Sequence, residues 1–338
     1  MTKTQTATRF ILIGLALVAL GLLLWKTSEV AIVAFGGVVG AAAWRGIAVP
    51  VARWTKLSEK KSVVLVVVVF LVVFIGAAWA FGAQASEQFA QLQQTIPRSI
   101  QEIKTHLQAS DTGRSVVRSV HQAMNSGDAV SRVGLAAGAL LAGAADMLLM
   151  LFVSIYLAID PGEYLRGFLR LLPPGRRPQV KSALEEAGAD LQKWLLAQLV
   201  AMAVVGVAVG TGLAILGVPL ALLLGLIAAV LEFVPVVGPI LFAIPGVLVA
   251  FTQSPKMVLS VVILYVVVQT LESNVLIPLL QRWAVRLPPV ISLVATLAAA
   301  ILFGPIGMIF ASPLAVVVLA LVKNLYVEDT LESPGVAA

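Results

Sequence analysis

The chain has 338 residues, of which 60% are hydrophobic and 12% are charged, and its mean hydropathy is +1.01. Soluble globular proteins carry about 25% charged residues, so this composition excludes a water-soluble protein. The apolar runs are much longer than the roughly ten-residue alternating strands of a membrane β-barrel. Because α-helices are the other structure that can span lipid, the chain is predicted to be an all-α polytopic membrane protein with about eight membrane segments.

The charge of the chain is a net +6, and it contains no cysteine. The lack of cysteine excludes disulfides and thiolate metal sites. Most lysines and arginines flank apolar runs, as the positive-inside rule describes for cytoplasmic loops. We therefore expect the lipid bilayer as a partner and no nucleic acid, and we predict neither a metal site nor a cofactor.

Residues 1–83 are predicted to form three membrane helices, at 10–25, 30–45 and 62–83. The loop between the second and third helices is rich in lysine and arginine, which indicates that it is cytoplasmic and that the amino terminus is also inside. Residues 84–133 are polar, with apolar residues at steps of three and four that are typical of amphipathic helices. This segment is predicted to be a small helical extracytoplasmic insert, with a new helical segment beginning at Pro97.

Residues 134–216 are predicted to contain two more membrane helices, at 134–159 and 195–216. The connection between them is basic, and 175–193 has the pattern of an amphipathic cytoplasmic helix lying along the inner membrane surface. Pairs of glycines spaced by four residues occur at 36–40, 134–138 and 206–210, a spacing that favours close helix packing.

Residues 217–325 are predicted to be a transport core of broken helices, followed by a cytoplasmic tail at 326–338. Ten of the 17 prolines lie between Pro219 and Pro313. Interior prolines break helices, and inside a membrane such breaks occur where protein or a water-filled cavity covers the freed backbone.

Two stretches in this core resemble each other. Residues 227–245 and 297–313 both run from an alanine-rich segment through Gly-Pro to Phe-Ala-x-Pro. Paired broken segments of this kind indicate the substrate site of a transporter. The stretches 219–251 and 289–322 could each be a re-entrant hairpin or a full span. We favour hairpins, because 219–251 is much longer than the ~20 residues that a span needs.

Three carboxylates lie within apolar sequence, where each costs at least about 2.5–3.5 kcal/mol to insert. Asp146 is in the middle of a predicted helix, and a structural hydrogen-bonding role is favoured for it. Glu232 and Glu272 each lie beside a break, so an ion- or solute-binding role is favoured for them. The candidate substrate- or ion-binding residues are Glu232, Pro235, Gly238, Pro239, Gln269, Glu272, Asn274, Gly304 and Pro305, with Asp146 and Gln198 as secondary candidates.

The sequence contains no motif for catalysis. It lacks a metalloprotease motif, a serine nucleophile elbow and a Walker loop, and both histidines lie in the polar insert. We therefore predict no catalytic residue and no enzyme activity, and any ATP-driven transport would need another chain.

Several motifs together resemble the autoinducer-2 exporter family of bacterial permeases. They are EFVPVVGPILFAIP at 232–245, QTLESNVLIP at 269–278 and FGPIGMIFASPLA at 303–315, preceded by YLAID at 156–160, LPP at 172–174 and LGVP at 216–219. Two features depart from the family pattern: Ala197-Gln198 replaces a Gly-Gln, and many members have a neutral residue at the position of Glu232.

The resemblance implies a multi-pass protein of the bacterial cytoplasmic (inner) membrane, with eight spans and both termini cytoplasmic. It also implies a homo-oligomer such as a pentamer. The family is named for export of a small polar signalling furanone, although other members resemble sodium(lithium)/proton antiporters.

Three functional hypotheses follow. The leading one is a secondary transporter that exports a small polar solute, similar to autoinducer-2, through a midplane site at the broken helices. The second is a sodium(lithium)/proton antiporter that uses Glu232 or Glu272. The third, from another class, is a non-transporting membrane scaffold that binds a partner through 84–133.

Overall fold

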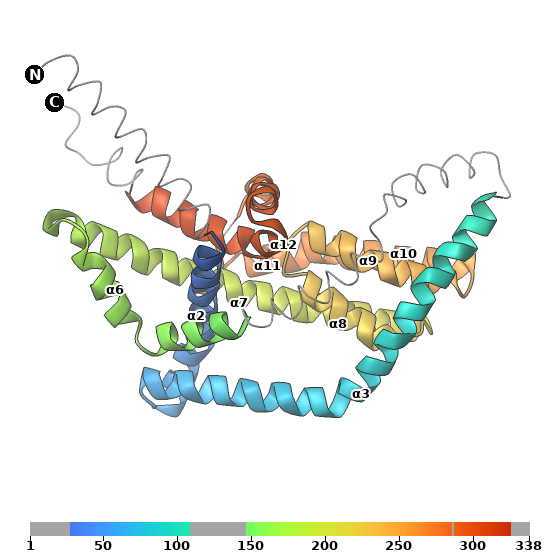
Figure 1. The fold of residues 1–338 in the computed structure, drawn as a ribbon, viewed down its shortest axis with the longest axis horizontal. Helices are drawn as coiled ribbons and strands as arrows, with labels where there is room; N and C mark the ends of the chain where they lie inside the picture. Colours follow the sequence, from blue (N-terminus) through green and yellow to red (C-terminus); the bar gives the residue numbers. More distant parts are fainter. Residues whose placement is uncertain (1–27, 109–146, 286, 326–338) are drawn as a thin grey trace, which may run out of the picture.

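The computed structural model describes residues 28–108, 147–285 and 287–325, and every regular element in these ranges is a helix (Figure 1). Four helices in the described ranges are long and apolar enough to cross a membrane, or five if the bent pair around Asp160 counts as one span. The all-α polytopic class is therefore confirmed, while the total of about eight segments stays a prediction.

Several predicted features lie outside the described residues. They are the membrane helix at 10–25, the part of the insert at 109–133, the first part of the 134–159 helix with Asp146, and the tail at 326–338.

The first two described helices are longer than predicted. Helix α2 spans Ser28–Thr55, and α3 spans Glu59–Gln108 without interruption. The predicted boundary at residue 83 and the predicted helix start at Pro97 are absent from α3. Helical hydrogen bonds do not depend on side-chain polarity, so one helix passes from the apolar stretch into the polar one.

A sharp corner follows the helix Met147–Ile159. This helix meets α6 (Pro161–Arg170) at an angle of 89°. After the short 3₁₀ turn η1 (Pro174–Arg176), α7 runs from Arg177 to Ile215 as one helix of 39 residues. The predicted amphipathic helix 175–193 and the predicted span 195–216 are therefore parts of one helix, whose length of roughly 58 Å is about twice the hydrocarbon thickness of a bilayer.

The last third of the described chain consists of interrupted helices. They are α8 (Ala221–Leu231), α9 (Val237–Phe251), α10 (Pro255–Leu271), the π-helical segment η2 (Glu272–Leu276), α11 (Ile277–Leu280) and α12 (Pro289–Val322). Helix α12 is kinked at Gly304, whose φ of 65° is readily available only to glycine.

Both broken stretches fold back on themselves. In the first, a Cβ on Gly238 at the start of α9 would lie 2.0 Å from the backbone oxygen of Leu231 at the end of α8. In the second, the hydroxyls of Ser292 and Ser312 lie 3.2 Å apart across the kink of α12. In a straight helix these serines would be about 30 Å apart, so the fold agrees with the hairpin interpretation.

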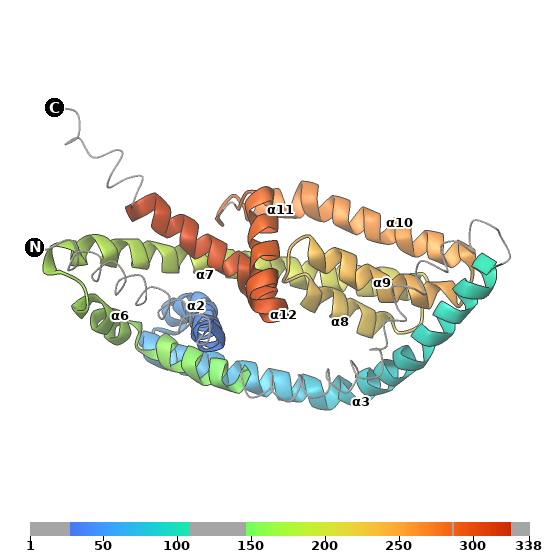
Figure 2. The same cartoon turned by 45° about the horizontal axis from the view of Figure 1, so that its top comes forward.

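Helices α7, α8, α9 and α10 lie side by side, and α2 crosses α7 and the first part of α3 (Figure 2). Their shared core includes Val209, Leu224, Phe242 and Val261, which are nearly fully buried. Glycines allow the closest helix contact: a Cβ on Gly225 of α8 would lie 2.7 Å from the Cα of Gly210 in α7.

The glycine pairs at 206–210 and 36–40 therefore pack as predicted. A Cβ on Gly206 would lie 2.5 Å from the Cβ of Ala229 in α8. On α2, a Cβ on Gly40 would lie 2.7 Å from the Cβ of Ser154. The third predicted pair, at 134–138, lies outside the described residues.

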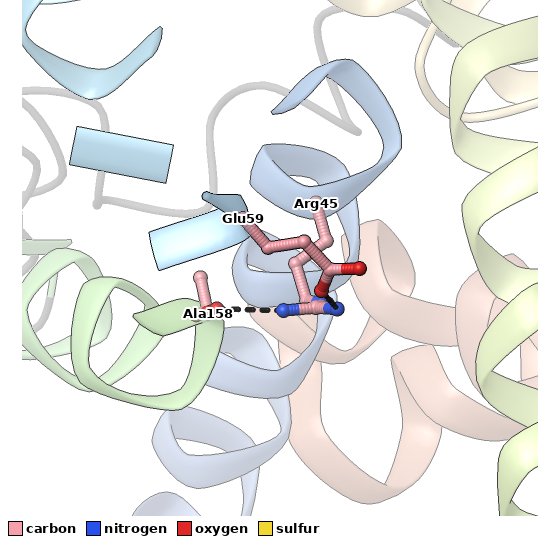
Figure 3. A network of polar contacts seen from close by, with 3 residues as sticks. All are labelled: Arg45, Glu59 and Ala158. Atoms are coloured by element: carbon pink, nitrogen blue, oxygen red, sulfur yellow. Dashed lines mark hydrogen bonds and ion pairs between the residues drawn. The ribbon is translucent and has the colours of Figure 1, made fainter. Parts of the chain in front are cut away.

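Polar contacts join the two basic connections of the chain. Arg45 donates one hydrogen bond to the backbone oxygen of Ala158 (3.2 Å) and forms an ion pair with Glu59 (2.6 Å) (Figure 3). Nearby, Lys60 pairs with Asp160, and the hydrogen bond from Lys60 holds the pKa of Asp160 below its usual value. The α2–α3 connection and the α6 corner therefore lie at the same end of the fold.

Candidate functional site

The two broken stretches and α7 surround a cavity of about 590 Å³, within the size range of small-molecule sites. Its walls come from α7, the break between α8 and α9, the end of α10 with η2 and α11, and the start of α12. The residues that line it include Glu232, Glu272, Gln198, Gln269, Trp194 and Ser292.

Glu232 lies at the break between α8 and α9. It caps the end of α8, and the backbone then turns through four more residues before α9 begins at Val237. The side chain is only 3% exposed, and its Oε2 has no hydrogen-bond partner among the described residues. Gln198 of α7 donates its side-chain amide to the backbone oxygen of Glu232 at 2.7 Å, which fixes the broken backbone at the cavity wall.

Glu272 begins the π-helical segment that follows α10. Its backbone oxygen accepts from the amide of Ile277, the five-residue step of a π-helix. Its Oε2 accepts a hydrogen bond of 2.8 Å from the side chain of Gln269. Short π-helical segments within α-helices occur frequently at functional sites, and this one lies at the cavity wall.

The carboxyl groups of Glu232 and Glu272 face each other closely enough to interact. They come from residues 40 positions apart and meet because the α8–α9 hairpin and α10 both pack against α7. Two adjacent carboxyl groups can hold one proton between them or exchange it for a cation. The arrangement is therefore suited to binding and releasing positive charge.

The break itself is backbone-strained. Val236 has a φ of 69°, a conformation that β-branched residues rarely adopt and that costs of order 1–3 kcal/mol. Pro235 precedes it, and Pro239 lies in the first turn of α9, where the missing amide is tolerated. Both prolines line the cavity.

A family model described as AI-2E family transporter matches residues 12–327. The chain belongs to the AI-2E transporter family. It is therefore a multi-pass membrane protein of a transporter family, and the resemblance inferred from the motifs is confirmed.

Relatives carry names of the same kind. "Putative transport protein YrrI" of Bacillus subtilis (strain 168) is 33% identical over 162 residues, which are 48% of this chain and 46% of YrrI. "Putative transport protein YueF" of the same organism is 32% identical over 174 residues, 52% of this chain and 47% of YueF. "Putative permease PerM" of Escherichia coli (strain K12) is 24% identical over 198 residues, 58% of this chain and 56% of PerM. The chain spans about half the length of the first two relatives.

Of the residues predicted for the site, this AI-2E chain brings six to the cavity wall. They are Gln198, Glu232, Pro235, Pro239, Gln269 and Glu272. Gly238 is buried beside the break, where it makes the close approach to Leu231 possible.

Other predicted site residues lie elsewhere. The side chain of Asn274 is exposed, and its amide donates to the backbone oxygen of Thr270 in α10 at 2.9 Å instead of lining the cavity. Gly304 lies at the kink of α12, the side chain of the neighbouring Pro305 is outside the described part of the structure, and Asp146 lies outside the described residues.

Several lining residues were missed by the sequence interpretation. Trp194 lies on α7 between the predicted surface helix 175–193 and the predicted span 195–216, and Ser292 lies near the start of α12. Neither residue lies in a sequence pattern that separates cavity-lining residues from core residues. Their position at the cavity depends on how α7 and α12 pack against the break between α8 and α9.

The charge of the cavity is negative in the part that the structure describes. Its described lining contains two glutamates and no lysine, arginine or histidine. Arg286, between the lining residues Val285 and Leu287, lies outside the described residues.

Proposed function

We propose that the chain is a secondary transporter whose substrate path passes through this cavity, with Glu232 and Glu272 carrying the coupling proton. The observation that supports this most strongly is the buried Glu232, which lines the cavity together with Glu272 and whose Oε2 has no hydrogen-bond partner among the described residues. A buried ionisable group inside a membrane protein is costly unless it has a function, and proton exchange supplies one.

The surrounding backbone also supports a transport path. Transporter sites commonly lie where interrupted helices meet, because freed amides and carbonyls are available there and the halves can move relative to each other. Here the α8–α9 break and the start of the folded-back α12 lie on the same cavity. Opening and closing of these hairpins would expose the carboxyl groups to one side of the membrane at a time.

Two cargoes are retained from the sequence analysis. A small polar solute, exported as the family resemblance suggests, is supported by the cavity volume and by the amide and hydroxyl groups of Gln198, Gln269 and Ser273. Sodium or lithium, exchanged for protons, is supported by the facing carboxyl groups of Glu232 and Glu272.

We propose a location in the bacterial cytoplasmic membrane, with both termini cytoplasmic and the protein assembled as a homo-oligomer such as a pentamer. The contacts of Arg45 and Lys60 with the α6 corner support this orientation, because they bring two basic connections to the same end. The positive-inside rule assigns that end to the cytoplasm.

Everted vesicles containing the protein test the proposal and separate the cargoes. Proton release from the vesicles on addition of sodium or lithium indicates antiport, while proton-driven accumulation of labelled autoinducer-2 indicates solute export. If no proton-coupled flux of any tested cargo exceeds that of vesicles without the protein, the transport proposal is wrong. If no flux occurs and the function of the protein still requires residues 84–133, the scaffold hypothesis is favoured.

A further inference from the structure

Most of the cavity wall is apolar and aromatic, and its acidic groups are confined to one region. Trp194, Ile240, Ile277 and Leu280 contribute apolar surface, together with several alanines and prolines. Trp194 is held in place by an edge-to-face contact with Phe233, at 6.1 Å between ring centroids. A ligand that fills this cavity must therefore present mainly apolar surface.

The polar groups of the cavity are already partly engaged. The amide of Gln198 donates to the backbone of Glu232, and that of Gln269 donates to Glu272. The carboxylate oxygen Oε2 of Glu232 remains without a partner although the side chain is nearly completely buried. The buried side-chain atom of the cavity wall that lacks a partner is thus a carboxylate oxygen.

We propose that the cavity binds an organic cation with an apolar body, which is exchanged for the proton held by Glu232 and Glu272. This inference rests on the proposed proton-coupled transport through the cavity and adds a substrate class to the two cargoes considered above. On binding, the carboxyl pair releases one proton to water, and the resulting negative charge pairs with the cation. The total charge of the occupied cavity is unchanged by the exchange.

The alternatives fit the walls less well. Selective sites for bare alkali ions surround the ion with several oxygen ligands, and no group of three or more acidic, histidine or cysteine side chains occurs in the described ranges. A neutral polyol needs many hydrogen-bonding groups, whereas most of this wall is apolar. An apolar cation matches both the size of the cavity and its single acidic region.

Trp194 supplies a second interaction for such a ligand. Cations are attracted to the faces of aromatic rings, most strongly to tryptophan. Because Trp194 and Glu272 line the same cavity, the aromatic and acidic attractions can act on one bound molecule.

Two probes of the same shape and opposite charge test the inference. Tetraphenylphosphonium is a cation, and tetraphenylborate is an anion of matching size. Equilibrium dialysis of the detergent-solubilised full chain is expected to show phosphonium binding at least tenfold tighter than borate binding, with about one proton released per phosphonium bound. Equal affinity for the two probes, or binding without proton release, would overturn the inference even if no variant folds.

Variants test which residues bind the phosphonium. Glu232→Gln and Glu272→Gln are each expected to weaken phosphonium binding by about tenfold or more, because a desolvated charge pair is lost. Glu186→Gln, on the exposed surface of α7 outside the cavity, is the matched control and should leave binding unchanged. Trp194→Leu should weaken binding about threefold or more, and Trp194→Phe should restore most of it. Unchanged binding in both glutamate variants would contradict the proposal.

The binding assay tests the organic-cation inference, and the flux assay tests the proposed function, so either can be contradicted alone. If sodium-dependent or solute-dependent flux occurs but the phosphonium does not bind, the proposed function stands and the organic-cation inference is wrong. If the phosphonium binds at the glutamates but no flux of any cargo occurs, the binding site stands and the transport proposal is wrong.

Discussion

Glu232 loses nearly all of its hydration in this fold, and no lysine or arginine among the described residues compensates for it. Burying an ionised carboxylate in a membrane costs at least about 2.5–3.5 kcal/mol. The group that faces it is Glu272, another acid, so neutrality at this point has to come from a bound proton or cation. This requirement links the packing of one side chain to the proposed exchange.

A second residue-scale feature is the close approach of Gly238 to α8. Gly238→Ala is expected to destabilise the protein by about 1–3 kcal/mol, because its Cβ would overlap the backbone of Leu231, and a backbone atom cannot move aside as the end of a flexible side chain can. Thermal unfolding in detergent measures the effect. Gly188→Ala is the control, since open space surrounds Gly188 in the interior of α7, and it should be neutral or stabilising by up to about 1 kcal/mol. Equal melting temperatures for the two variants would contradict the tight corner.

At the scale of elements, the sequence predicted the breaks better than the helix lengths. Proline and glycine directly limit backbone hydrogen bonds and conformation, so the interruptions after Glu232 and at Gly304 were expected. The continuous helices α3 and α7 differ from the predicted boundaries, because a helix can continue across a change from apolar to polar residues. The π-helical segment at Glu272 could not be predicted, since QTLESN has no residue that forbids an ordinary α-helix.

The fold of α12 gives an element-scale prediction. Because the chain contains no cysteine, a variant carrying Ser292→Cys and Ser312→Cys has only these two thiols. Mild oxidation should join them into an intramolecular disulfide, since the native hydroxyls lie 3.2 Å apart. The disulfide is detected as loss of both thiols to maleimide labelling, without formation of dimers, and the two single-cysteine variants are the controls. Two thiols that stay reactive would indicate that α12 is a straight span.

At the scale of the whole molecule, the site depends on contacts between distant segments. Gln198, Glu232 and Glu272 meet at one cavity. In the sequence, the one indication of this proximity is that Glu232 and Glu272 each lie beside a predicted helix break. The sequence identified both acids and Gln198. It placed Asn274 in the same site, whereas the exposed side chain of Asn274 donates to the backbone oxygen of Thr270 in α10. Trp194 was missed because its position on the cavity follows from the packing of α7.

The orientation of the molecule gives a further prediction. If 219–251 and 289–322 are hairpins, the turn after α11 lies on the cytoplasmic side. Arg282 is exposed in this turn, so Arg282→Cys should react with an impermeant maleimide only after the cells are opened. Ser58→Cys, between α2 and α3, is the matched cytoplasmic control. Labelling of Arg282→Cys, but not of Ser58→Cys, in intact cells would contradict the hairpin topology.

Proton flux in proteoliposomes tests whether Glu232 and Glu272 carry the proton exchanged during transport. The flux is measured on addition of sodium, lithium, the polar solute or the organic cation. Wild type and Glu186→Gln should show the same cargo-dependent flux. Glu232→Gln and Glu272→Gln should each reduce it at least about tenfold while the protein remains folded and inserted. Wild-type flux in both glutamine variants would show that the carboxyl pair does not couple transport to proton movement.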